Sequence, residues 1–226
     1  MIPPSYVDNF YDDPDQIVNT ALGLKYYGPN QDENFPGIRT DCVSNINYDF
    51  YNYSVNRFLS CFFEMRPDII WEARNHFQKI YCSDQDHPHH PFNLGWVHRD
   101  DEEQFRTIAG VIYLNKKTYP NSGTSIYNLN RDFNDSFIWA KGDFNHGEPI
   151  DERIYAESQH NHNKQFDLTL EFKNQYNRMI GYDGHEWHSQ PCFWVPGECR
   201  LTQVFFINFK NEIPPLKRYH PSSLKS

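Results

Sequence analysis

The sequence predicts an α+β protein that is mainly β, with flanking helices at its N-terminal end and a β-sandwich or barrel core. Helical periodicity occurs twice before residue 75, and short β-type segments separated by turn residues follow. The length of 226 residues suits a single domain. We expect that domain to divide into a mainly helical flank, a β core and a tail, at 1–74, 75–210 and 211–226.

Two helices are expected in the flank. The first follows Asp13, a favourable N-cap, with Pro14 at the first helical position and Gly23 as its terminator. The second covers 53–65, where apolar residues recur at i, i+3, i+4, i+7 and i+8. Such a stripe is typical of a helix that packs on a core.

Strand-like segments dominate the chain after the flank. They are rich in β-branched and aromatic residues and are bounded by turn residues, at 77–82, 95–100, 105–115, 124–129, 177–182, 187–190 and 199–209. The polar, mixed segment 131–165 lies between two of them. We interpret it as an insertion, and insertions of this length are commonly lids or mobile loops.

Composition excludes several classes of protein. No apolar run approaches the ~18 residues of a membrane span, and the first residues lack the pattern of a secretory signal. Five cysteines without a C-x-x-C pair indicate reduced thiols, so we expect a cytoplasmic protein. A formal net charge of −9 argues against a nucleic-acid-binding surface, which needs clustered Lys and Arg.

His98 and Asp100 are the first candidates for chemistry. Residues i and i+2 of a strand point to the same face, so an imidazole and a carboxylate would converge there and suit a divalent metal. A surface or hydrogen-bonded histidine is the alternative. His146 and Glu148 have the same spacing, but they lie in the Gly- and Asn-rich insertion, where nothing fixes their geometry.

A second group of candidates lies near the C-terminus. The segment 177–189 indicates a strand, a turn and a second strand that carries His188, although a lone histidine there is commonly structural. Arg200 opens the strand RLTQVFFINF on an otherwise apolar face. A buried arginine there needs an anionic partner, whereas an arginine at the strand end would reach water.

Together these segments resemble the Fe(II)- and 2-oxoglutarate-dependent oxygenases, in particular the prolyl hydroxylase-like branch. The resemblance runs from 77 to 209 and rests on H-x-D at His98 and Asp100, the strand ending YLN, the Gly-Thr turn, NRMIGYDG with WHS, and RLTQVFF. It implies a double-stranded β-helix, that is, a jelly-roll or cupin-like barrel. It also implies Fe(II), 2-oxoglutarate as cosubstrate and ascorbate as a further cofactor.

Carried over to this chain, the resemblance assigns a role to each candidate. His98, Asp100 and His188 would bind the iron and form the catalytic centre, and Arg200 would hold the distal carboxylate of 2-oxoglutarate. Tyr113 matches a tyrosine that contacts the same carboxylate, although strand tyrosines are commonly core residues. His185 competes with His188 as the distal ligand, but the W-H-S pattern and the spacing to the arginine favour His188.

Other candidates are weaker. Histidines in two tracts could form a metal site, but their loop composition is typical of solvated side chains; they are His87, His89, His90, His160 and His162. Of the tryptophans, Trp187 alone has a position beside a candidate ligand.

The leading hypothesis is a dioxygenase that hydroxylates a peptide residue or small molecule with O₂ and releases succinate and CO₂. The alternatives are a non-catalytic jelly-roll that binds a ligand and a cupin-like metalloenzyme without 2-oxoglutarate. The latter would have no need of Arg200.

Overall fold

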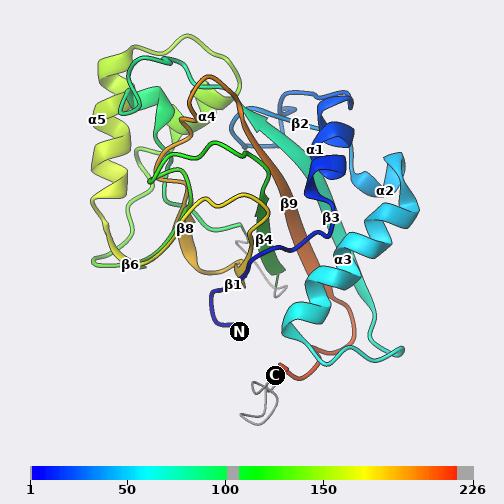
Figure 1. The fold of residues 1–226 in the computed structure, drawn as a ribbon. Coiled ribbons are helices and arrows are strands. Elements are labelled where there is room, and N and C mark those ends of the chain that lie inside the picture. The colour runs from blue at the N-terminus through cyan, green and yellow to red at the C-terminus, as the bar shows by residue number, and fades with distance from the viewer. Residues whose placement is uncertain (1, 101–106, 218–226) are drawn as a thin grey trace.

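A computed structural model gives the structure of the protein and describes residues 2–100 and 107–217 (Figure 1). The elements in chain order are β1 (Ser5–Val7), α1 (Pro14–Leu22), β2 (Ile38–Arg39), α2 (Val43–Ile46), α3 (Tyr48–Phe62), β3 (Trp71–Ile80), a 3-10 turn η1 (Pro91–Asn93), β4 (Thr107–Tyr113), β5 (Thr124–Leu129), α4 (Trp139–Asn145), α5 (Glu152–Asn163), β6 (Phe166–Phe172), β7 (Met179–Asp183), β8 (Trp187–Ser189) and β9 (Arg200–Phe209).

Two antiparallel sheets form the β part of the molecule. The larger has the strand order β1-β7-β4-β9-β3-β2, and the smaller has the order β6-β5-β8. Apolar side chains from strands of both sheets pack together, among them Val111, Ile126 and Val204. The prediction of a mainly β, α+β protein is therefore confirmed, and the sheets enclose a space between them.

The N-terminal helices cover the outer face of the larger sheet (Figure 1). Alternation along each strand sends one set of side chains to these helices and the other set between the sheets. Helix α3 packs closely here because Gly110 and Gly181 have no side chain: a Cβ on either would lie within 2.6 Å of a phenylalanine ring of α3. Phe58 and Phe62 supply those rings.

The two expected helices exist, with one boundary corrected. Helix α1 begins after Asp13, whose carboxylate accepts a hydrogen bond from the backbone N–H of Gln16, as predicted. Helix α3 begins at Tyr48 rather than at residue 53 and ends at Phe62. Asn47 caps it through its side chain, a polar signal that precedes the apolar stripe.

The segment 131–165 is more ordered than a loop. It contains α4 and α5, which pack with η1 around a small aromatic cluster that includes Trp96 and Tyr155. In Figure 1 they lie beside the smaller sheet, on the side away from α1 to α3. The insertion is therefore a helical subassembly that is attached to the β part.

Two strand predictions need correction. Segment 95–100 is not a strand: His98 makes an isolated bridge with His188 instead. Strand β3 begins at Trp71, six residues before the predicted start, because its first half pairs with β9 although it is partly exposed. Strand β6, which the sequence analysis missed, pairs with β5.

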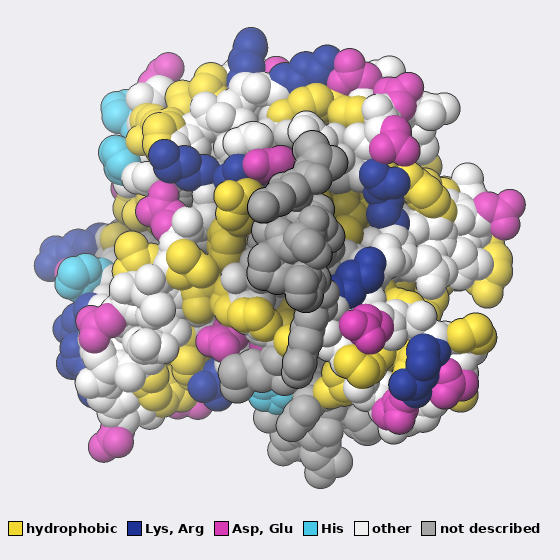
Figure 2. Space-filling model, turned by 60° about the horizontal axis from the view of Figure 1, so that its bottom comes forward, with side chains coloured by type: hydrophobic (Ala, Val, Ile, Leu, Met, Phe, Trp, Pro, Cys, Tyr) yellow, Lys and Arg dark blue, Asp and Glu magenta, His cyan; other side chains and the backbone are white. Residues whose placement is uncertain are grey.

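Charged side chains of both signs are interspersed on the face shown in Figure 2. Apolar side chains, in yellow, lie among them, and the Lys and Arg side chains visible on this face are scattered rather than gathered into one patch. None of the helices in the described parts of the chain is long and apolar enough to cross a membrane.

Candidate metal centre and its cavity

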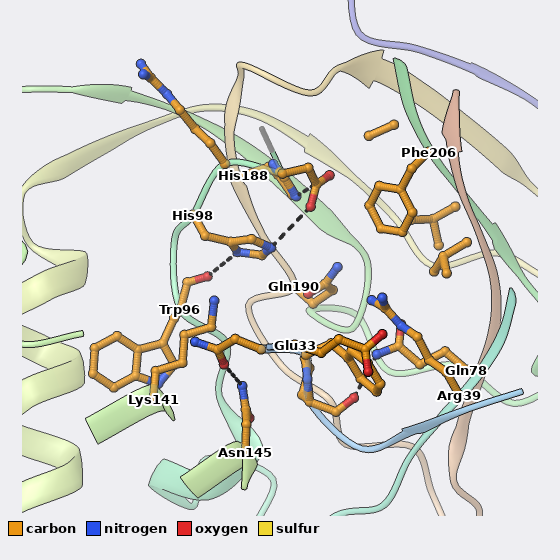
Figure 3. Close-up of a pocket in the computed structure, with 18 of the residues that line it drawn as sticks. Glu33, Arg39, Gln78, Trp96, His98, Lys141, Asn145, His188, Gln190 and Phe206 are labelled. Carbon is orange, nitrogen blue, oxygen red and sulfur yellow. Dashed lines mark hydrogen bonds and ion pairs between the residues drawn. The ribbon is translucent and has the colours of Figure 1, made fainter. Parts of the chain in front are cut away.

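His98, Asp100 and His188 converge at one point between the sheets (Figure 3). Their ligand atoms all lie within 4.8 Å of one another. His98 Nε2 lies 3.8 Å from one carboxylate oxygen of Asp100, and His188 Nε2 lies 3.4 Å from the other. In the described part of the chain, this is the one group of three or more His, Cys, Asp or Glu side chains so arranged.

Backbone pairing aligns the two histidines. The N–H of His98 donates to the carbonyl of His188 at 2.8 Å, and the reverse bond measures 2.9 Å. Each imidazole also donates from Nδ1 to the carbonyl two residues earlier, that of Trp96 or Glu186, at 2.9 Å. These bonds fix both rings with Nε2 towards Asp100, which is the orientation and tautomer that a metal ligand requires.

The surroundings of His98 favour the neutral imidazole, which can bind a metal ion. Burial lowers the pKa of His98 well below its usual value, with Lys141 and His188 adding to the effect. The imidazole is therefore neutral at physiological pH, and a neutral imidazole is the form that binds metal. Two imidazole nitrogens and one carboxylate on the same side of a centre match the donor set of non-haem Fe(II) sites, so these residues fit the metal that the resemblance implies.

His185 lies apart from this group. It sits on the turn before β8, its Nδ1 is 3.1 Å from Asp183 Oδ1, and its side chain is 42% exposed. It lines the same cavity without joining the converging ligand atoms. Of the two histidines that the sequence offered for the distal position, the structure brings His188 to His98 and Asp100.

Arg200 is a buried cation that forms no ion pair with any described residue. It is 1% exposed, so it does not reach water from the strand end. Its Nε donates to the carbonyl of Ser122 at 3.2 Å, while Nη2 has no hydrogen-bond partner. Burial lowers the pKa of its guanidinium, and the neighbouring Tyr113 and Tyr182 oppose that shift.

Tyr113 lies beside this arginine. The Arg200 guanidinium carbon is 5.6 Å from the Tyr113 ring centre, and the Tyr113 hydroxyl donates to Thr124 Oγ1 at 2.9 Å. Thr202 Oγ1, on the same face of β9, is also buried without a partner. Neither Arg200 nor Tyr113 lines the open cavity, but Tyr182 and Val204, which pack with Tyr113, do.

The cavity in front of the metal ligands has a volume of about 1260 Å³. Aromatic side chains, Trp187 among them, form much of its wall. Sequence reasoning missed the four cations that also line it: Arg39 from β2, Arg74 from β3, Arg99 between the two candidate ligands, and Lys141 from α4. No motif in the sequence marks these positions.

The other described histidines form no such group. His87 pairs with Asp84, and His90 lies 3.5 Å from Glu152. His162 contacts the carbonyl of Val97 through Nε2. The expectation of solvated side chains is therefore wrong for His162, which is buried in α5, whereas His87 is exposed.

Solved structures with a similar fold include proteins from three organisms. A prolyl hydroxylase from Trichoplax adhaerens, in complex with a hypoxia inducible factor peptide fragment, has 10% sequence identity and a TM-score of 0.54 over 91% of this chain and 83% of its own. HygX from Streptomyces hygroscopicus, with nickel and 2-oxoglutarate bound, has 9% identity and a TM-score of 0.54 over 92% and 83%. EvdO2 from Micromonospora carbonacea var. aurantiaca has 10% identity and a TM-score of 0.56 over 96% and 90%.

At these identities the likeness establishes a shared fold and leaves activity to the chemistry of the site. No curated protein sequence matches the chain. The sequence model of one protein family matches residues 3–192, which include both metal-ligand segments. The chain therefore belongs to DUF6445, a family of unknown function.

Proposed function

We propose that this protein is an Fe(II)- and 2-oxoglutarate-dependent oxygenase that hydroxylates a peptide residue or a small molecule. The observation that carries the proposal is the convergence of His98, Asp100 and His188, with both imidazoles fixed by their Nδ1 hydrogen bonds. The likeness in fold to HygX, whose structure contains nickel and 2-oxoglutarate, supports it.

Each residue has a role that its surroundings support. His98 and His188 would hold the iron through Nε2, and Asp100 would supply the anionic ligand. When bound, the iron and the 2-oxo acid couple decarboxylation to succinate and CO₂ with oxidation of a C–H bond by O₂. The residues of the chain orient the ligands, keep the His98 imidazole neutral and enclose the centre between the sheets.

Arg200 would bind the distal carboxylate of 2-oxoglutarate. A guanidinium that is 1% exposed, with Nη2 unpartnered, lacks the anion that burial of a charge requires. Thr202 would donate to the same carboxylate from its hydroxyl group, and Tyr113 would do so with its O–H turned to the carboxylate and its oxygen accepting from Thr124 Oγ1. A cupin-like metalloenzyme without a 2-oxo acid offers no reason for this arrangement, which is why we prefer the oxygenase.

The proposal also includes a fold, the double-stranded β-helix, and a cellular compartment, the cytoplasm. We infer that the two sheets form the double-stranded β-helix of the oxygenases. All five cysteines are free, which suits a reducing compartment, so we expect the protein to act in the cytoplasm. Ascorbate as a further cofactor stays a prediction.

The test is anaerobic Fe(II) binding followed by 2-oxoglutarate turnover in air, with succinate measured. We expect one iron per chain and succinate formation in the native protein, and neither in Asp100→Ala. His146→Ala is the matched control, because its ring contacts only the Glu33 carbonyl at the surface. Iron binding without succinate would favour the cupin-like alternative, and unaltered turnover in Asp100→Ala would exclude the proposed centre.

A further inference from the structure

Two of the cations that line the cavity form no ion pair with any residue that the structure describes. Lys141 is 8% exposed, and within the described chain its ammonium has neither a hydrogen-bond partner nor an ion pair. Arg39 lines the same cavity; its Nε is buried without a partner, and its Nη2 reaches only Gln78 Oε1, at 3.5 Å. Burial of unpaired charge is costly, so a binding partner from outside the chain is expected.

Their positions suggest cooperation with the metal centre. Lys141 and Arg39 lie on opposite sides of the space below His98 in the close-up (Figure 3). His98, Lys141 and Arg39 line the same cavity. An anion held between them would therefore lie next to the metal ligands.

None of the described carboxylates that line the cavity forms an ion pair with Lys141 or Arg39. Asp100 faces both of them, but it is committed to the metal in the proposed function. Glu33 also acts on Arg39, yet it is exposed and its carboxylate accepts a hydrogen bond from the Asn30 N–H. Metal binding at Asp100 would leave the inner cavity more positive still.

Neither cation is needed for 2-oxoglutarate. Arg200, in its own buried pocket with Tyr113, is the anchor in the proposed function, and the iron would offset the near carboxylate of the cosubstrate. Lys141 and Arg39 lie on the open side of the centre, in a cavity of about 1260 Å³. Small-molecule sites commonly measure about 300–1,000 Å³, so this one has room for a substrate beside the cosubstrate.

The aromatic surroundings define the rest of the ligand. Phe35 and Phe206 flank the Arg39 guanidinium at 4.1 and 5.4 Å from their ring centres, so its faces are covered and its edge is left to bond. A planar edge of N–H donors matches a carboxylate. Trp96 and Phe193 add apolar wall to the same cavity.

On the basis of the proposed function, we propose that the substrate is a small organic acid with an apolar or aromatic body, whose carboxylate is held between Arg39 and Lys141. The cations would fix the acid group so that a carbon of its apolar body lies at the metal centre. A phosphate ester offers the same anionic chemistry, and the experiment below separates the two.

The experiment measures binding with full-length protein, both Ni(II)- and 2-oxoglutarate-loaded and metal-free. The probes are matched pairs, 3-phenylpropionate with 3-phenylpropionamide and octanoate with octanamide, and phenyl phosphate. Calorimetry should show the acids binding at least tenfold more tightly than their amides in both forms. If phenyl phosphate binds more tightly than either acid, the anion site exists but its ligand is a phosphate ester, and the assignment to a carboxylic acid is wrong.

Variants then locate the site. Lys141→Met and Arg39→Gln should each weaken acid binding about 10- to 100-fold, the range for a lost charged hydrogen bond. Their affinity for 2-oxoglutarate should not change, which also shows that they fold. Lys173→Met and Arg131→Gln are the matched surface controls, and both residues are exposed.

Several results would overturn the proposal. Equal affinity for acids and amides, or no binding of any anionic probe, would exclude the site. A loss of 2-oxoglutarate affinity in Lys141→Met or Arg39→Gln would make these cations the cosubstrate anchor instead. Failure of the proposed function gives a different result. In that case Ni(II) or 2-oxoglutarate would not bind, while the metal-free protein would still bind acids more tightly than amides.

Discussion

Lys141 provides a quantitative test of the uncompensated charge in the cavity. Burial lowers the pKa of its ammonium from 10.5 to about 8, with Asp100 opposing the shift and Arg39 adding to it. A lowered pKa means that the folded state disfavours the charged form of this side chain. The shift corresponds to about 3 kcal/mol of unfolding free energy at neutral pH.

The pH dependence follows from the sign of that shift. Between pH 8 and 10.5 the unfolded chain keeps the proton on Lys141 that the folded chain has lost. The unfolding free energy of the native protein therefore rises with pH across this window. At pH values below 8 both states are protonated, and the full cost of the buried charge is present. Replacing the residue with methionine removes the cost and keeps most of the side-chain volume.

Lys141→Met should accordingly stabilise the metal-free protein by about 3 kcal/mol at pH 7, and the gain should shrink as the pH rises from 8 to 10.5. Urea unfolding followed by tryptophan fluorescence, at several pH values, measures the difference between variant and native protein. Lys173→Met, an exposed control, should change stability by less than about 0.5 kcal/mol. A loss of stability at pH 7 that does not vary with pH would mean that the ammonium has a stabilising partner, and the reasoning would be refuted.

Four further predictions address the centre and the fold. Asp100→Ala should abolish Fe(II)-dependent succinate formation in a coupled assay, and normal turnover would remove it from the ligand set. Arg200→Ala should weaken 2-oxoglutarate binding by about 2–5 kcal/mol in calorimetry, since a buried charge partner is lost; an unchanged affinity would place the anchor elsewhere. His188→Ala should lose iron while His185→Ala retains it, and the reverse result in metal analysis would exchange their roles. Gly123→Ala should lower stability by at least about 1–3 kcal/mol in thermal unfolding, because its Cβ would lie 1.8 Å from a carbonyl oxygen of β6; a native melting temperature would contradict that contact.

Strands β5 and β9, which lie around the candidate centre, could be predicted from the sequence because their residue patterns are local. Thr124–Leu129 and the segment RLTQVFFINF coincide with β5 and β9 to within a residue. The spacing of His98 and Asp100 placed both side chains on one side, although the chain there forms an isolated bridge rather than a strand. Their meeting with His188 depends on pairing across 90 residues of chain, which no local pattern encodes and which only the resemblance suggested.

The helices of the insertion could not be predicted in the same way. The buried residues of α5 are polar or aromatic, among them Ser158, Gln159 and His162, so the helix has no apolar stripe to detect. Polar contacts replace apolar packing there: Gln159 donates to the carbonyl of Leu94, for example. Strand β6 is a different case, because the alternation in FDLTLEF was visible and was overlooked.

The two kinds of residue in the cavity come from different parts of the fold, and this division bears on substrate choice. The candidate metal ligands are fixed by backbone pairing beside β8, whereas Lys141 comes from α4 and Arg39 from the short edge strand β2. Segments outside the central strands tolerate change more readily, while paired strands hold a precise geometry. Changes at Lys141 and Arg39 should therefore alter which acid binds and leave iron affinity intact. A change in iron affinity as large as the change in acid binding would mean that the insertion supports the metal centre itself, and the two parts would then be one unit.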